Sequence, residues 1–187
     1  MKDKIPFYNI VNMFFVGAVF SLCLAILLRS YIPFEWIKEN AELLSDWSLL
    51  ISAILLIAMY EFGFIINRIG SIVIVPLYSH KKLNIWPKDD YGIDVSEIAQ
   101  VNPRFQSMIT ELNLMRSHIM ICVLLSAVAL FLKEWVWIIS FVVLIAVFTF
   151  GGKKHNEKIN KIRKDYAERK EEKKNETQER KEYLANN

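Results

Sequence analysis

Residues 47–78 read WSLLISAILLIAMYEFGFIINRIGSIVIVPLY, and this stretch decides the fold. A bilayer core requires about 20 apolar residues of helix, and residues 47–66 meet that requirement with a single carboxylate, Glu61, near the inner end. The apolar pattern continues as far as Leu77, which is more than one membrane thickness at about 1.5 Å of rise per residue. We therefore predict a spanning helix whose far end is buried by protein or lies in the membrane interface.

The charged residues of the chain are segregated from the apolar ones. The chain has 187 residues, of which 53% are hydrophobic, and its charges gather in a middle loop and near the C-terminus. Soluble domains intersperse charge along their helices, so this segregation is typical of a membrane protein. Cys23 and Cys122 lie inside apolar segments, where we expect two small core side chains rather than a disulfide or a thiolate metal site.

Three further apolar runs, residues 7–28, 117–132 and 135–150, bring the number of predicted spans to four. The first run is longer than the apolar part of a signal peptide and lacks a cleavage pattern, so it should be retained as a span. The last two runs are joined only by Lys133 and Glu134, and so short a connection forces an antiparallel helical hairpin.

A stripe of small residues lies on one face of the first span. Gly17, Ser21 and Ala25 follow one another at intervals of four residues, which aligns them on a helix. We expect another helix to approach closely there, and copies of the chain to associate through this stripe and the C-terminal tail. The alternative is that small residues are simply tolerated in lipid.

The segments outside the spans also favour helix. Asn102-Pro103 is a helix-start signal, and the apolar stripe that follows predicts an amphipathic helix continuing into the third span. Gly151-Gly152 are expected to end the fourth span. Beyond them, a seam at Ile159, Ile162 and Tyr166 predicts a short bundle near the membrane followed by a solvated helix; the alternative is a wholly unpaired charged helix.

The basic residues decide the orientation, because cytoplasmic segments carry an excess of Lys and Arg. The N-terminus, the middle loop and the C-terminal tail hold most of them, which predicts an inner (plasma) membrane protein with both termini in the cytoplasm. The expected fold class is all-α, a polytopic membrane protein with four transmembrane helices, a small cytoplasmic helical layer and a charged C-terminal helix. Its divisions are residues 1–78, with spans one and two and a cytoplasmic extension; 79–116, the cytoplasmic loop and helical region; 117–150, the hairpin of spans three and four; and 151–187, the charged tail.

Catalytic signatures are missing from the sequence. It contains no phosphate-binding loop, zinc-protease, serine-hydrolase or C-x-x-C pattern. Turn and helix-cap duties explain Asp89, Asp90 and Asp94 better than a cation site does. We expect no enzymatic activity, no metal and no cofactor.

Three polar residues within or beside the spans are candidates for a pore or gate: Glu61, Arg68 and Asn12. An isolated carboxylate in lipid is costly, so Glu61 must be solvated by headgroups, paired with a cation or exposed to a water-filled path. Arg68 lies seven residues further along the same helix face and is able to pair with Glu61 across a subunit boundary or by a long reach.

A second candidate site is the middle loop, where basic and aromatic residues alternate. Such a set suits an anionic nucleotide or a short single-stranded oligonucleotide. The alternative is that positive-inside bias alone explains the cations and that Trp86 and Phe105 belong to the core. The predicted ligand-binding residues are Lys81, Lys82, Trp86, Lys88, Arg104 and Arg116.

Two short elements carry a resemblance to a known group of proteins. At Arg68-Ile69-Gly70-Ser71 with Pro76, and at Glu111-Leu112-Asn113 with Arg116, the chain is similar to small four-span bacterial membrane effectors of anti-phage defence operons. The overall plan resembles the channel effector of the Hailong-type system. The resemblance implies an oligomeric channel controlled by nucleotide oligomers, but no functional residue is carried over from it.

Two functions follow as expectations. The first is a homo-oligomeric channel or membrane-permeabilising effector, with a tetramer favoured, that a cytoplasmic nucleotide-like ligand or partner gates in antiviral defence. The second is a non-conducting membrane anchor whose charged tail recruits a cytosolic protein.

Overall fold

The computed structural model describes residues 7–31, 34–78 and 95–185, and within them the regular structure is entirely helical. The connections contain short elements: η1 (Arg29–Tyr31), α2 (Phe34–Glu39), α3 (Ala41–Asp46) and α5 (Val95–Val101). Four other helices are long and apolar enough to cross a membrane, which confirms the all-α class and the number of potential spans. These are α1 (Phe7–Leu27), α4 (Ser48–Tyr78), α6 (Pro103–Phe131) and α7 (Trp135–Ala185).

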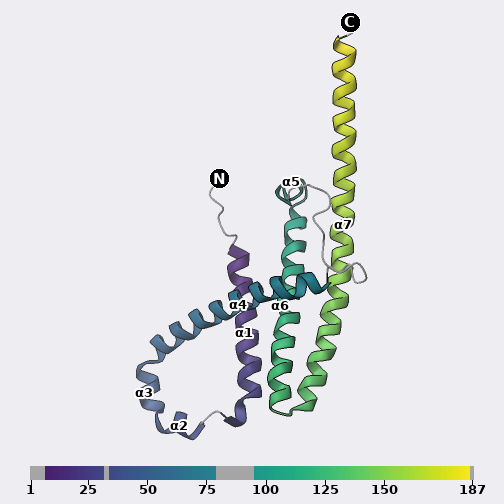
Figure 1. Cartoon of the computed structure of the whole chain (residues 1–187). Coiled ribbons are helices and arrows are strands. Elements are labelled where there is room, and N and C mark those ends of the chain that lie inside the picture. Colours follow the sequence, from purple (N-terminus) through teal and green to yellow (C-terminus); the bar gives the residue numbers. More distant parts are fainter. Residues whose placement is uncertain (1–6, 32–33, 79–94, 186–187) are drawn as a thin grey trace.

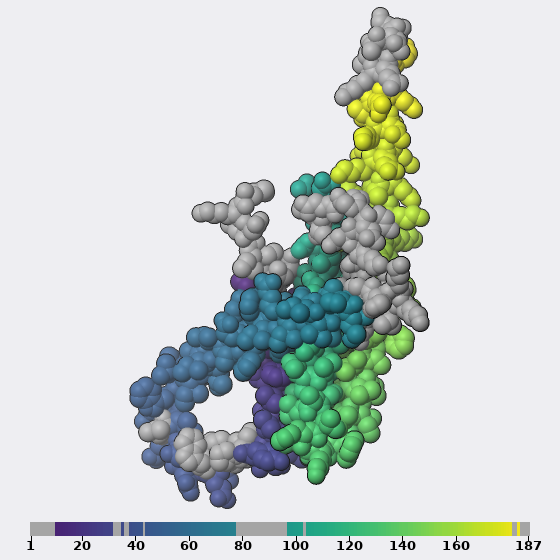
Figure 2. Space-filling view, in the orientation of Figure 1, coloured from purple at the N-terminus to yellow at the C-terminus, as the bar shows by residue number. Residues whose placement is uncertain are grey.

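The helix α4 is strongly inclined to the common direction of the other long helices. Figure 1 shows α1, α6 and α7 lying side by side along one common direction, while α4 crosses α1 and α6. The first half of α4 diverges from α1, and an opening separates the two helices in the space-filling view (Figure 2). The second half of α4 packs on α6 with one face, formed by Ile66, Gly70 and Ile74, while Ile72 on the other face is 73% exposed.

The crossing of α1 and α4 depends on two glycines. A Cβ atom added at Gly17 would lie 1.7 Å from the carbonyl oxygen of Met59, and one added at Gly63 would lie 1.8 Å from that of Met13. The two backbones are therefore in direct contact, an approach that only residues without side chains permit. The close approach predicted for Gly17 is present, and the helix that makes it is α4 of the same chain; Ala25, at the other end of the predicted stripe, is exposed.

The hairpin between α6 and α7 ends α6 with a left-handed residue. Lys133 has φ of 60°, its N–H donates to the Leu130 carbonyl, and the N–H of Glu134 donates to the Ala129 carbonyl. These two bonds form a Schellman cap, in which glycine is the usual residue. The tight hairpin expected from the short connection is thus confirmed.

The helix α7 continues without a break from the fourth apolar run through Gly151 and Gly152 into the charged tail. Gly151 lies beside α6, where an added Cβ would make an ordinary contact of 3.7 Å with the Met115 sulfur. Beyond this contact, Ile159 joins Phe105, Ile98 and Leu112 in a second apolar cluster that ties α7 to α5 and α6. The predicted seam therefore packs within the chain, and the residues from 168 to 180 are exposed.

Helix α6 is continuous from its cap through the third apolar run, as predicted. The side-chain oxygen of Asn102 accepts a hydrogen bond from the Arg104 N–H at 3.2 Å, and proline follows the cap directly. This helix forms the centre of the main core, where Ile119, Leu125 and Ala129 have no exposed surface.

Candidate functional site at the crossing of three helices

A polar cavity lies where α1, α4 and α6 meet. Its volume is about 120 Å³, which is enough for several water molecules. Apolar groups of Met13, Val16, Gly63 and Leu114 complete its wall. We call its polar residues the polar node: Asn12 of α1, Asn67 of α4, and Thr110, Asn113 and Ser117 of α6.

The amide of Asn67 is the centre of the hydrogen bonding in the polar node. Its side-chain oxygen accepts a bond of 2.6 Å from Nη2 of Arg116. The hydroxyl of Ser117 lies 3.2 Å from the same oxygen and 3.1 Å from the Asn113 carbonyl, and its one proton is available to either acceptor. These bonds join α4 to α6 through polar groups in an otherwise apolar contact.

The guanidinium of Arg116 has little electrostatic compensation. Its side chain is 8% exposed, and its Nε has no hydrogen-bond partner. Among the described residues no carboxylate pairs with Arg116, while the charge of Arg68 acts on it unfavourably. A buried cation without an anion is costly to keep, so the short bond to Asn67 is important for holding α4 on α6.

The polar node lies at one edge of the apolar part of the bundle. Met115, next to Arg116, contacts α7 at Gly151, just past the end of the apolar run of α7 at Phe150. The next residues of α7 are Lys153 and Lys154, which are exposed. The charge of Arg116 is thus close to the transition from apolar to charged surface.

The structure separates the three pore or gating candidates. Asn12 lines the cavity of the polar node, whereas Glu61 and Arg68 are exposed on α4. Glu61 forms no ion pair with any residue that the structure describes, and the guanidinium carbon of Arg68 lies 5.1 Å from the centre of the Phe64 ring. The two charges do not pair within the chain, and among the described residues nothing neutralises either of them.

The predicted ligand-binding residues are only partly described. Lys81, Lys82, Trp86 and Lys88 lie outside the described residues, as do Asp89, Asp90 and Asp94.

The two described members of that ligand-binding set are not brought together. Arg104 is exposed and Arg116 is buried against α4; they are twelve residues apart on one helix, or about 18 Å along its axis. For Phe105, the sequence left a place in the core as the alternative to ligand binding. Its side chain has no exposed surface and belongs to the second apolar cluster.

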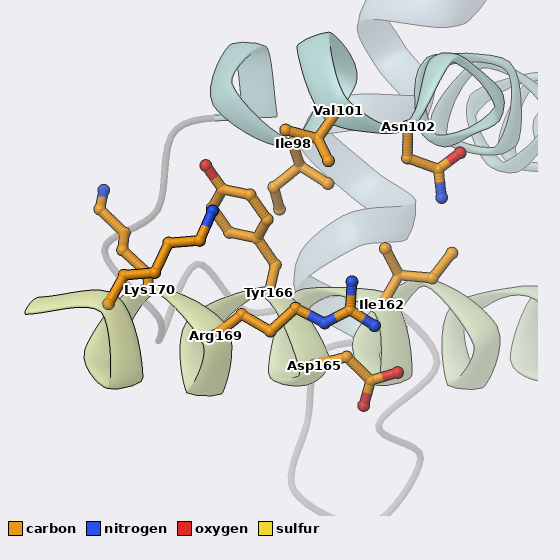
Figure 3. A pocket seen from close by; sticks show the side chains of 9 residues that line it. Ile98, Val101, Asn102, Ile162, Asp165, Tyr166, Arg169 and Lys170 are labelled. Carbon is orange, nitrogen blue, oxygen red and sulfur yellow. The ribbon is translucent and has the colours of Figure 1, made fainter. Parts of the chain in front are cut away.

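A separate groove lies between α5 and α7 (Figure 3). Its volume is about 320 Å³, with an apolar floor that includes Ile98, Ile162 and Tyr166. Its rim carries one carboxylate, Asp165, and three cations, Arg169, Lys170 and Lys173, which leave the rim basic. Lys170 is hydrogen-bonded to Glu97 of α5 at 2.6 Å, which fixes one side of the groove. This basic and aromatic groove was not predicted, because the tail and the helix before the third span are far apart in sequence.

Sequence reasoning also missed Asn67 and Ser117. Asn67 directly precedes Arg68, and Ser117 directly follows Arg116; both arginines were predicted site residues. Asn67 interrupts an apolar run, and that interruption was a usable signal for a buried polar contact.

Protein-family models, curated proteins and solved structures include no match to this chain. In the part of the chain that the structure describes, no group of three or more His, Cys, Asp or Glu side chains is arranged to hold a metal ion.

Proposed function

We propose that this chain is the subunit of a homo-oligomeric channel or membrane-permeabilising effector, acting in bacterial antiviral defence. A signal on the cytoplasmic side, a nucleotide-like ligand or a partner protein, controls it. The inner membrane holds the protein with both termini inside. A tetramer is the favoured assembly.

The observation that carries this proposal is the exposure of Glu61 and Arg68 on an apolar helix. Both charges lie on the side of α4 that the other described residues leave uncovered. Charged side chains in membrane helices face a protein interior or a water-filled path rather than lipid. The described part of one chain provides neither for these two residues, which supports an assembly of several chains.

The divergence of α4 from α1 gives a second argument for assembly. Leu49, Ile54 and Ile57 in the first half of α4 are 84%, 57% and 63% exposed. Lipid is able to cover apolar side chains, but a steeply inclined helix beside an opening (Figure 2) also offers room for another subunit. A change in the tilt of α4 then opens a path.

The route for control from the cytoplasmic side is α6. Asn102 at the start of α6 lines the groove between α5 and α7, and Asn113 and Ser117 further along α6 line the polar node. A ligand or partner that closes the groove pulls on α6. Helix α6 is also bonded to Asn67 of α4 through Arg116. The groove's basic rim and Tyr166 suit an anionic ligand with a flat apolar group.

Planar-bilayer recording of the purified protein tests the channel. We expect conductance steps from the wild type, and a changed conductance or open probability in Glu61→Gln, which keeps the shape and removes the charge. Glu171→Gln, which removes an exposed carboxylate on α7, is the matched control and should conduct as the wild type does. A wild type that never conducts, with or without nucleotides, rejects the channel.

Topology is testable separately. In a chain with Cys23 and Cys122 replaced by alanine, a membrane-impermeant thiol reagent added to intact cells should label a cysteine at Glu39 and spare one at Asn175. Labelling at Asn175 from outside contradicts the proposed orientation and the cytoplasmic control.

The non-conducting anchor is the second candidate, and the length of α7 favours it. Figure 1 shows α7 projecting far beyond the other helices, and its residues from 168 to 180 are exposed. A solvated, charged helix of this kind is a suitable surface for a soluble partner. Deleting residues 174–187 should abolish recruitment if the chain is an anchor and leave conductance intact if it is a channel.

A further inference from the structure

The exposed face of α4 carries a regular stripe. Ile54, Ile57, Glu61, Ile65, Arg68 and Ile72 succeed one another at intervals of three or four residues, and all six are exposed. These intervals align side chains on one side of a helix. We call this set the α4 stripe.

The α4 stripe is diametrically opposite the face that packs within the chain. The inward face consists of Gly63, Ile66, Gly70 and Ile74, which contact α1 and α6. At about 100° per residue, Glu61, Ile65, Arg68 and Ile72 lie about 180° from that face. The α4 stripe is therefore the side of α4 that the rest of the bundle holds outward.

The two charges of the α4 stripe are placed symmetrically about one point. Glu61 and Arg68 are equally far from the midpoint between Phe64 and Ile65. Ile57 and Ile72 are also equally far from that midpoint. A second helix of the same sequence, running antiparallel and centred there, sets Glu61 opposite Arg68 twice and Ile57 opposite Ile72 twice.

We propose that the α4 stripe is a twofold interface with a second copy of this chain, in which each Glu61 pairs with Arg68 of the second copy. The inference rests on the proposed homo-oligomer and names its contact, so that a tetramer is a pair of such dimers. Two ion pairs then neutralise all four charges, and the isoleucines exclude lipid and water around them. Such an interface is isologous, since the same surface serves both copies.

The charge order selects the antiparallel arrangement over the parallel one. Two parallel stripes in register set Glu61 against Glu61 and Arg68 against Arg68, and like charges in a low-dielectric setting repel strongly. An antiparallel contact is compatible with copies that have the same orientation in a membrane, because α4 runs steeply across the bundle (Figure 1). A twofold axis along the bundle reverses the lateral part of its direction and leaves the part along the bundle unchanged, so the two copies of α4 cross at the midpoint of the stripe with their lateral directions opposed.

The interface also gives Glu61 a role in the closed form of the proposed channel. Paired with Arg68 of the second copy, its carboxylate is dry and neutralised. A rotation or shift of α4 that separates the copies exposes both charges to water, and the free-energy difference between these settings biases the equilibrium.

Cysteine cross-linking tests the geometry directly, in full-length protein lacking Cys23 and Cys122 and reconstituted in liposomes. Oxidation should join copies carrying Ile57→Cys to differently tagged copies carrying Ile72→Cys, while neither variant joins to itself. Ile65→Cys, beside the twofold axis, should join to itself. Val73→Cys, which is 46% exposed but lies off the stripe, is the control and should not cross-link.

Charge exchange tests the ion pairs. Glu61→Arg or Arg68→Glu alone sets like charges together and should weaken dimerisation at least about tenfold, measured by single-molecule photobleaching in liposomes. The double variant Glu61→Arg/Arg68→Glu restores opposite charges and should return to within about threefold of the wild type. Because the double variant carries both substitutions, its recovery separates a lost ion pair from a failure to fold.

Several outcomes overturn the interface. Ile57→Cys joining to itself indicates a parallel contact, and no cross-link at Ile65 indicates that lipid headgroups or water cover the stripe. Single exchanges without effect remove the ion pairs. A cross-linked dimer that never conducts keeps the interface and rejects the channel, whereas conductance without these cross-links keeps the channel and rejects the interface.

Discussion

Replacing Gly63 with alanine should force α1 and α4 apart. The added Cβ would lie 1.8 Å from the Met13 carbonyl oxygen, whereas ordinary contacts of a Cβ begin at 3.4 Å. The oxygen belongs to helix backbone and is unable to rotate away, so the helices must separate by about 1.6 Å, the difference between those distances. Overpacking costs about 1–3 kcal/mol, and we expect the upper part of that range here.

Part of this cost is offset locally. Alanine is a better helix former than glycine by about 1 kcal/mol, which leaves a net loss of about 2 kcal/mol in the free energy of unfolding. Gly70→Ala on the same helix is the matched control, because its Cβ would lie 3.6 Å from the nearest side-chain atoms, an ordinary contact. It should be neutral or stabilising by up to about 1 kcal/mol.

Pulse proteolysis across an SDS titration in mixed micelles measures both variants. The double variant Gly17→Ala/Gly63→Ala adds a sharper test, because helices already separated by one methyl group accommodate the second at little further cost. The two changes should therefore be strongly non-additive. Equal stability of Gly63→Ala and Gly70→Ala, or fully additive losses at Gly17 and Gly63, would refute the backbone contact.

Three more outcomes are expected from the same unfolding assay. Asn67→Leu leaves the Arg116 guanidinium without its acceptor and should cost about 2–3 kcal/mol, while adding Arg116→Met should recover most of that loss; no recovery in the double variant contradicts the proposed dependence. Lys133→Gly relieves a left-handed residue and should stabilise the hairpin by about 0.5–1 kcal/mol, and a loss of stability there would contradict the Schellman cap. Phe105→Ala removes a fully buried ring and should cost about 3–5 kcal/mol, whereas Val101→Ala, 69% exposed, should change stability by less than about 0.5 kcal/mol.

Features local in sequence were predictable. The four apolar runs, the cap at Asn102 and the hairpin at Lys133 each follow from residues within a few positions of one another. The causes are the length of each apolar run, a helix-start N–H that needs an acceptor, and a short connection. Each of them acts between residues that are close in sequence. Gly151 and Gly152 show the limit of this reasoning, because two glycines after an apolar run do not say whether the helix continues, and α7 passes through both without a break.

Features that depend on the crossing of two helices were not predictable. The sequence places Gly17 in one apolar run and Gly63 in another, but nothing in either run says that they meet. The bond between Asn67 and Arg116 depends on the height at which α4 crosses α6, and a helix apolar on nearly all sides has no pattern that sets its tilt. The α4 stripe is equally hidden, because isoleucines occur on both faces of α4 and only the packing of Gly63, Ile66 and Ile74 distinguishes one face from the other.

The two faces of α4 make different contacts: the inward face packs within the chain, and the α4 stripe faces the proposed second copy. One helix therefore connects the polar node with the proposed interface. The inward face is held by backbone contact at Gly63 and by the Asn67–Arg116 bond, so α4 rotates only if that bond breaks or α6 moves with it. Asn67 and Arg68 are adjacent residues, and a rotation that frees the amide from Arg116 therefore also carries Arg68 away from any partner on the α4 stripe. A signal that displaces α6 thus acts on both contacts at once, which is the property that a two-state gate requires.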